Sequence, residues 1–347
     1  MSQDILPSDY EAFLQSIKTR VQQAQLQAIF AVNKELILLY WHIGRGILER
    51  QKEQGWGAKV IDHLSKDLHH AFPHMKGFSP RNLKYMRAFA QAYPDLSFVQ
   101  TVSAQITWSH NIALLDKVKD SGERVWYIQQ AIEDGWSLSV LETQISTKLY
   151  QRKGKALTNF QATLPALQSD LARDVLKDPY VFDFITTGDD TKERHLQSAL
   201  LGHIQRFLLE LGAGFTFVGS NYHLVVGDED FYLDLLFYHL HLRCFVVIEL
   251  KRGDFKPEYA GKVNFYLTAV DKQRKHPSDN PTIGIILCET KNEVKVEYAL
   301  SDMKKPIGVA SYQFTTSLPD ELKEQLPDVK QLEKSLQEVK KSIEEEN

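Results

Sequence analysis

Apolar side chains recur at helical spacing through the first 150 residues of the chain. Between residues 9 and 32 the spacing is that of an amphipathic helix, and the apolar positions are Phe13, Ile17, Val21, Leu26, Ile29 and Phe30. The same spacing continues beyond residue 32, where Gly44 and Gly46 are positions at which a helix could break. Ser79 and Pro80 are residue types that favour the N-cap and first position of a helix. The pattern predicts helices at residues 9–32, 57–72, 79–93, 110–134 and 137–150.

The second half of the chain alternates short apolar runs with helical segments. The runs are rich in β-branched and aromatic residues, as strands are. Strands interleaved with helices predict a mixed α/β domain. We expect strands at residues 215–219, 222–227, 231–238, 244–251, 282–290, 294–300 and 307–314, and helices at 191–211 and 257–273.

A length of 347 residues favours two domains, and the helical pattern weakens after residue 150. We therefore predict a helical N-terminal domain at residues 1–155 and an α/β domain at 156–318. Residues 319–347 form a charged tail.

The net charge of -4 is unevenly distributed. Residues 1–155 hold 19 Lys and Arg against 15 Asp and Glu, so the remainder holds 41 − 19 = 22 against 45 − 15 = 30. A mildly basic half is compatible with nucleic-acid binding. Cys244 and Cys288 lie inside apolar runs, which indicates a reduced protein without disulfides. No membrane-spanning run or secretory signal is recognisable, so we expect a cytoplasmic protein.

The stretch from Phe231 to Phe255 contains charges inside two apolar runs. Asp234 interrupts the first run, and Glu249 and Lys251 end the second. If the two runs form a hairpin whose paired residue numbers sum to 483, Asp234 lies opposite Glu249. Directly opposed residues in such a ladder have Cβ atoms roughly 4.5–5.5 Å apart. The pattern therefore predicts that the three charged groups converge.

Two acids in close contact are unfavourable unless a cation lies between them. Oxygen ligands without Cys or His favour Mg²⁺ or Mn²⁺, and the backbone carbonyl of Leu250 adds a further oxygen. One or two metal ions, with Lys251 orienting water or stabilising charge, suit phosphodiester hydrolysis. The alternative is that these charges are ordinary strand-end residues near solvent.

Asp234, followed after fourteen residues by Glu249-Leu250-Lys251, resembles the D…(D/E)xK motif of the PD-(D/E)XK nuclease superfamily. The segments "YWHIGRGILERQ", "GWGAKVIDHLSKDL" and "FSPRNLKYMRAFAQAYP" resemble the N-terminal domain of YhcG-type proteins, and the resemblance extends over residues 10–315. It implies a winged-helix-like, DNA-binding N-terminal domain and a restriction-endonuclease-like α+β core with a mixed sheet. It also implies a nuclease with a role in DNA recombination, repair or defence.

One departure from the superfamily pattern concerns the first helix of the core. Many members carry a metal-facing acid there, at a position near Gln197 of this chain. Glu193 lies one turn earlier on the same face, and Glu210 is a second candidate. An amide can still bind a metal through its carbonyl oxygen.

Two helices carry candidate nucleic-acid contacts. Lys262 and Tyr266 lie four residues apart on the helix after Pro257 and could approach a phosphate. The helix at 79–93 fits the second helix of a helix-turn-helix that enters the major groove. Its candidate residues are Arg81, Asn82, Lys84 and Arg87. In both cases the alternative is a solvated helix face.

The sequence thus predicts a Mg²⁺- or Mn²⁺-dependent nuclease whose substrate is DNA. The alternative, motivated by Gln197, is a DNA-binding or complex-assembly factor with an inactive nuclease core. Action on RNA is a weaker option. Cutting both strands of a duplex needs two sites, which is compatible with a homodimer. A partner protein from a DNA-processing system is also compatible with the sequence.

Overall fold

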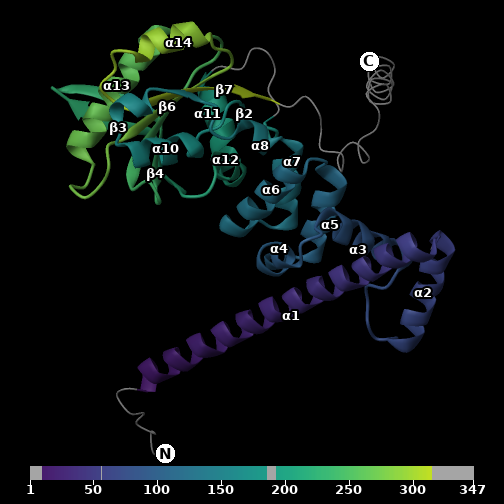
Figure 1. The fold of residues 1–347 in the computed structure, drawn as a ribbon. Coiled ribbons are helices and arrows are strands. Elements are labelled where there is room, and N and C mark those ends of the chain that lie inside the picture. The colour runs from purple at the N-terminus through teal and green to yellow at the C-terminus, as the bar shows by residue number, and fades with distance from the viewer. Residues whose placement is uncertain (1–9, 56, 186–192, 315–347) are drawn as a thin grey trace, which may run out of the picture. The chain divides into compact units, whose positions relative to one another are not determined.

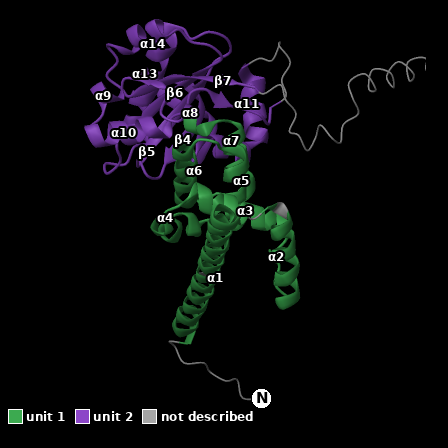
Figure 2. Ribbon diagram, turned by 45° about the vertical axis from the view of Figure 1, so that its right-hand side comes forward, with its two compact units in different colours: residues 1–150 green, residues 151–347 purple. Residues whose placement is uncertain are grey.

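The computed structural model describes residues 10–55, 57–185 and 193–314. The chain divides into two compact units, residues 1–150 and 151–347 (Figure 2). The boundary predicted after residue 155 therefore lies inside the second unit, where Arg152 pairs with Glu210. Among the described residues, no helix is long and apolar enough to cross a membrane.

Unit 1 is helical, as predicted, and its described residues contain no strand that could form the wing of a winged helix. The predicted helix at 110–134 is two helices, because Asp120 caps a new helix by accepting a hydrogen bond from the Glu123 backbone N–H. The elements are α1 (Tyr10–Gln54), α2 (Ala58–Ala71), α3 (Pro80–Ala92), α4 (Leu96–Thr101), η1 (Ser103–Gln105), α5 (Trp108–Lys117), α6 (Ser121–Glu133) and α7 (Leu138–Ser146), followed by α8 (Leu149–Arg152) at the unit boundary.

Helix α1 runs without interruption through Gly44 and Gly46, so the predicted breaks are absent (Figure 1). Gly44 has a packing role instead, because α3 crosses α1 at this point. A Cβ atom at residue 44 would lie 1.9 Å from the carbonyl oxygen of Met86. At Gly46 the nearest atom to such a Cβ would be the Arg50 Nη1, at 3.4 Å.

These two glycines provide a matched pair of substitutions. We expect Gly44→Ala to destabilise unit 1 by about 1–3 kcal/mol, because α3 must move to admit the methyl group. Gly46→Ala should stabilise the same helix by up to about 1 kcal/mol, since alanine has the higher helix propensity. Thermal and urea unfolding of both variants checks this, and equal effects at the two positions would contradict it.

The predicted mixed sheet is the centre of unit 2. Strands β3, β4 and β5 are antiparallel, whereas β5, β6 and β7 run parallel. The order is β1-β7-β6-β5-β4-β3, with β2 paired to β7. The strands are β1 (Leu157–Thr158), β2 (Tyr180–Val181), β3 (Phe215–Val226), β4 (Glu229–His239), β5 (Cys244–Leu250), β6 (Ile283–Cys288) and β7 (Ile307–Gln313).

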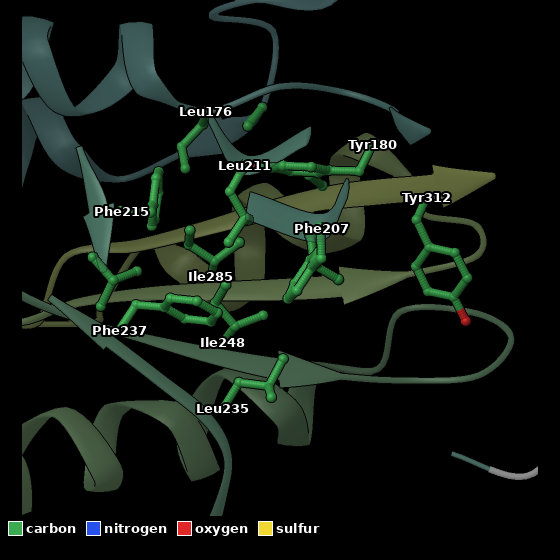
Figure 3. Packing of buried hydrophobic residues seen from close by; sticks show 14 of the residues in the cluster. Leu176, Tyr180, Phe207, Leu211, Phe215, Leu235, Phe237, Ile248, Ile285 and Tyr312 are labelled. Carbon is green, nitrogen blue, oxygen red and sulfur yellow. The ribbon is translucent and has the colours of Figure 1, made fainter. Parts of the chain in front are cut away.

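Helices cover both faces of this sheet. On β5, Val246 and Ile248 pack into one apolar cluster with Phe207 of α12, as Figure 3 shows in part. Val247 packs into the cluster on the opposite face with Leu267 of α13. Alternate residues of a strand thus serve opposite faces. The helices of this unit are α9 (Phe160–Thr163), α10 (Ala166–Val175), α11 (Glu193–Gly202), α12 (Ile204–Leu211), α13 (Pro257–Gln273) and α14 (Glu293–Leu300).

Residues 294–300 form helix α14, so the strand predicted there is wrong. Val296 and Leu300, four positions apart, are buried, while Tyr298 between them is 77% exposed. Asn292 caps the helix by accepting a hydrogen bond from the Lys295 backbone N–H. Apolar residues alternate with polar ones here, which is the pattern of a strand, but the side chains that face the core are four positions apart, as in a helix.

Two other element boundaries differ from the prediction. The helix expected at 191–211 is divided at His203 into α11 and α12. The two strands expected at 215–219 and 222–227 form one strand, β3, with a register shift between Phe217 and Gly219.

Candidate active site

The predicted hairpin register is confirmed by the structure. Strands β4 and β5 pair from His239↔Cys244 to Leu235↔Ile248, and both pairs sum to 483. Before Leu235, β4 pairs only with β3 among the described strands. The two strands of the hairpin therefore separate at Asp234 and Glu249, the residues that come next in this register.

Where the backbone ladder between β4 and β5 ends, the side chain of Asp234 makes the next hydrogen bond to β5. Its Oδ2 accepts a hydrogen bond of 2.8 Å from the backbone N–H of Leu250 on β5. Burial and the negative charge of Glu249 raise the pKa of Asp234 from 3.8 to about 6. The negative charge of ionised Asp234 is therefore only partly compensated by its surroundings.

Glu249 is fully buried, and its two oxygens have different surroundings. Oε1 lies 3.0 Å from the Nζ of Lys251 and 2.6 Å from the Nζ of Lys262. Oε2 is buried and has no hydrogen-bond partner among the described residues. A buried carboxylate oxygen without a partner is costly, so this atom is a candidate ligand for a cation.

Lys251 connects the hairpin to helix α11. Its Nζ lies 3.0 Å from Oε1 of Glu249 and 3.0 Å from Oε2 of Glu193, and 5.4 Å from the ring centre of Tyr259. Burial alone would lower the pKa of Lys251, but the charge of Glu249 and the hydrogen bonds to Glu193 and Glu249 outweigh it and raise the pKa. Lys251 is therefore a fixed cation beside the two acids.

The three candidates for the acid of the first core helix have different roles. Glu193 reaches the site through Lys251, and its Oε1 also accepts a hydrogen bond from the Arg252 backbone N–H at 3.5 Å. Gln197 is buried, and its Nε2 donates to the backbone carbonyl of Asp234 at 2.6 Å. Glu210 lies away from these residues and pairs with Arg152 and Lys177.

The hydrogen bond of Gln197 leads to a prediction about Gln197→Glu. Instead of supplying a missing metal ligand, we expect this change to destabilise unit 2 by about 1–3 kcal/mol, because a carboxylate cannot donate to the Asp234 carbonyl. The measurement is urea unfolding against wild type. The control is Gln273→Glu on α13, which removes a similar but exposed hydrogen bond to the Val225 carbonyl. Unchanged stability of Gln197→Glu together with tighter Mg²⁺ binding would contradict this prediction.

Lys262 and Tyr266 of α13 lie nearer the acids than the sequence indicated. Lys262 contacts Glu249 and has a 42% exposed side chain, so it can meet both the acid and solvent. Tyr266 is 4% exposed, and its ring centre lies 5.3 Å from the Nζ of Lys262. A phosphate contact by either residue remains a prediction, although the burial of Tyr266 disfavours it.

Sequence reasoning missed two contributors beside the motif. Tyr259 places its ring near the Lys251 ammonium group. Glu289 follows β6 and binds the Arg252 guanidinium at 2.6 Å and the Gly253 backbone N–H at 2.8 Å. A signal was present, since Glu289 directly follows a strand that runs parallel to β5, and such strand ends meet at one edge.

The candidate DNA-contacting residues of α3 fall into two groups. Arg81 and Lys84 are exposed. The side-chain amide of Asn82 is hydrogen-bonded inside unit 1, since it donates to the Gly77 carbonyl and accepts from the Trp108 indole N–H. Arg87 is half-buried and donates to Gln51. DNA contact by these residues stays a prediction, and Arg81 and Lys84 are the most available for it.

The donor set of the site suits a hard divalent cation. The described residues contain no cluster of three or more His, Cys, Asp and Glu arranged to hold a metal. Mg²⁺, however, is usually bound by one or two carboxylates together with water and substrate phosphate. Asp234 and Glu249 supply two carboxylates, and the unpartnered Oε2 of Glu249 is available. The site therefore fits such an ion.

Comparison with known families defines the class of protein. Residues 173–327 match the family model of the YhcG PDDEXK nuclease domain, and residues 16–152 match that of the DUF1016 N-terminal domain. Most of unit 2 therefore matches a PDDEXK nuclease domain.

The chain belongs to the YhcG family. It is 31% identical over 348 residues to the Escherichia coli (strain K12) protein named "Putative nuclease YhcG", covering 90% of this chain and 92% of that protein.

Similarity to solved structures is weak. A crystal structure of a repair endonuclease from Pyrococcus abyssi has 11% identity and a TM-score of 0.25, covering 38% of this chain and 49% of that chain. The structure of an EndoMS–dsDNA2 complex has 10% identity and a TM-score of 0.25, covering 39% and 51%. Each match spans about half of the solved chain.

Proposed function

We propose that this protein is a metal-dependent nuclease that hydrolyses phosphodiester bonds in DNA. The observation that carries the proposal is the convergence of Asp234, Glu249 and Lys251 where β4 separates from β5. Membership of a family with a PDDEXK nuclease domain supports the same reaction class. The biological setting that fits such an enzyme is DNA recombination, repair or defence.

Mg²⁺ or Mn²⁺ is the proposed cofactor, held by Asp234, Glu249 and the carbonyl of Leu250. The Leu250 N–H points toward Asp234, and in an extended strand the carbonyl of the same residue faces the same side. When bound, such an ion polarises a phosphoryl oxygen and lowers the pKa of water.

Lys251 acts as a positioned cation in this proposal. Two carboxylates and the Tyr259 ring hold its ammonium group in place. A charge fixed in this way can orient the attacking water and stabilise negative charge on the phosphoryl group, without reorganising during the reaction. Glu193 is the residue that positions Lys251 from α11.

DNA is the proposed substrate because basic groups are exposed in both units. Arg81 and Lys84 are exposed on α3 of unit 1, and Lys262 is partly exposed beside the acids of unit 2. Contacts of Lys and Arg with phosphates supply most of the sequence-independent affinity for DNA. We therefore propose that α3 contacts the duplex and that unit 2 performs the cleavage.

A second candidate is a DNA-binding factor with an inactive core. It is favoured by the ion pairs of Glu249, because Lys251 and Lys262 compensate its charge without a metal. Such a factor would bind DNA equally well with and without Mg²⁺ and would release no products.

The test is cleavage of labelled linear, nicked, branched and single-stranded DNA with Mg²⁺ or Mn²⁺, beside an EDTA control and matched RNA. Products that require both the metal and Asp234, as judged with Asp234→Ala, are expected. Wild-type rates in Asp234→Ala would overturn the site assignment. Tight DNA binding by a folded protein, without products from any substrate, would favour the second candidate.

A further inference from the structure

The first part of α1 extends away from the other helices of unit 1 (Figures 1 and 2). We call residues 10–32 the arm. At a rise of 1.5 Å per residue the arm is about 34 Å long. The contacts of α1 with the body of unit 1 include Asn33, which donates 3.0 Å hydrogen bonds to the carbonyls of Ala104 and Ile106, and Ile37, which is fully buried.

The arm carries an apolar stripe that faces solvent. Val21 is 50% exposed and Ile17 is 40% exposed, and Leu14 is half-buried. The stripe alternates steps of four and three residues over three heptads, which is the pattern of a coiled-coil seam. Its members are Tyr10, Leu14, Ile17, Val21, Ala24, Ala28 and Ala31.

The sizes of these residues change along the arm. The first half of the seam holds large side chains, from Tyr10 to Val21, and the second half holds only alanines. A parallel pair of arms would put large residues against large ones and alanine against alanine. The helices would then have to diverge at one end and converge at the other. An antiparallel pair puts a large residue opposite an alanine in each layer between residues 14 and 31, so the helix axes stay equally spaced along that part of the seam.

We propose that the arm is a dimerisation element that pairs antiparallel with the arm of a second copy of this chain. An alignment in which residue numbers across the seam sum to 45 fills each of the layers between residues 14 and 31 with one large and one small side chain, and Tyr10 lies beyond them, level with Glu35. Because each contact occurs twice, the interface is related by a two-fold axis, as in most homodimers. The layers are Leu14 with Ala31, Ile17 with Ala28, and Val21 with Ala24.

The charges beside the seam are compatible with this pairing. Lys18 follows a seam residue, and in the antiparallel arrangement it lies beside Gln25 of the second copy, which also follows a seam residue. Arg20 precedes a seam residue and lies beside Gln27 of the second copy, which does the same. No two cations are therefore opposed in the alignment, and repulsion does not prevent association.

The first test measures the oligomeric state of the full chain. Wild type should be a dimer by light scattering and sedimentation. Val21→Glu buries a carboxylate twice in the interface and should weaken the dimer about 100-fold or more. Gln22→Glu, on the exposed side of the same turn, should leave the dimer unchanged. A wild-type monomer at all concentrations overturns the proposal, as does a dimer unaffected by Val21→Glu.

The second test measures the direction of pairing. The native cysteines, Cys244 and Cys288, are buried, so wild type is the control for background reaction with a short thiol crosslinker. A mixture of Leu14→Cys and Ala31→Cys chains should crosslink, whereas Leu14→Cys alone should not. Efficient crosslinking of Leu14→Cys alone would show a parallel pair and overturn the antiparallel arrangement. These outcomes do not depend on nuclease activity.

Discussion

The variant Glu249→Gln is expected to lose both nuclease activity and stability. Cleavage should fall about 1,000-fold or more, since a carboxylate that binds the metal is replaced by a neutral amide. Stability should fall by about 2–3 kcal/mol, because Lys251 and Lys262 would keep their charges without the buried partner. The loss should be smaller than for a fully buried pair, as Lys262 is partly exposed.

A matched control for Glu249→Gln is available on the neighbouring strand. Glu229 begins β4 and is exposed, so Glu229→Gln should change the free energy of unfolding by no more than about 0.5 kcal/mol. Denaturant unfolding and DNA cleavage of both variants are the measurements. A fully stable Glu249→Gln protein would show that the two lysines do not depend on this carboxylate.

The variant Asp234→Asn is expected to lose activity to a similar extent but to gain stability when metal is absent. The amide oxygen introduced by this substitution can still accept the hydrogen bond from Leu250, while the uncompensated negative charge beside Glu249 is removed. A pKa raised from 3.8 to about 6 corresponds to a penalty of about 3 kcal/mol for the charged form at neutral pH. The gain should be of this order or less.

The pH dependence of that gain follows from the direction of the pKa shift. The folded protein holds the Asp234 proton up to about pH 6, while the unfolded chain releases it near the ordinary value of 3.8. Stability of the wild type therefore falls as the pH rises from about 4 to 6, and the penalty is complete above that range. In EDTA, Asp234→Asn should unfold at a higher temperature than wild type at pH 7.5 and at the same temperature as wild type near pH 4. An advantage independent of pH would contradict this assignment.

The convergence of Asp234 and Glu249 followed from the sequence only on the condition that the hairpin turn is centred between His241 and Leu242. The observed ladder, whose paired residue numbers sum to 483, meets that condition. A slip by one residue would have turned the side chains to the other face of the sheet. The motif itself identified Lys251.

Contacts between elements distant in sequence could not be predicted in the same way. The approach of Lys262 to Glu249 depends on how α13 packs against β5, and the hydrogen bond of Gln197 depends on the placement of α11. Residues 294–300 are too few for the spacing of their apolar residues to distinguish a strand from a helix. In the structure they form a helix that Asn292 caps. These differences arise where tertiary packing outweighs the local pattern.

The arm of α1 also sets a distance in the proposed dimer. With paired residue numbers summing to 45, the centre of the pairing lies midway between residues 22 and 23. Helix α3 crosses α1 at Gly44, so the two crossing points are 43 residues apart, which is about 65 Å along the arms. Dimeric DNA-binding proteins contact half-sites one turn of the double helix, about 34–36 Å, or a multiple of that distance apart, and 65 Å is close to two turns. The length of an exposed helix would thus define the spacing at which two copies meet the same duplex.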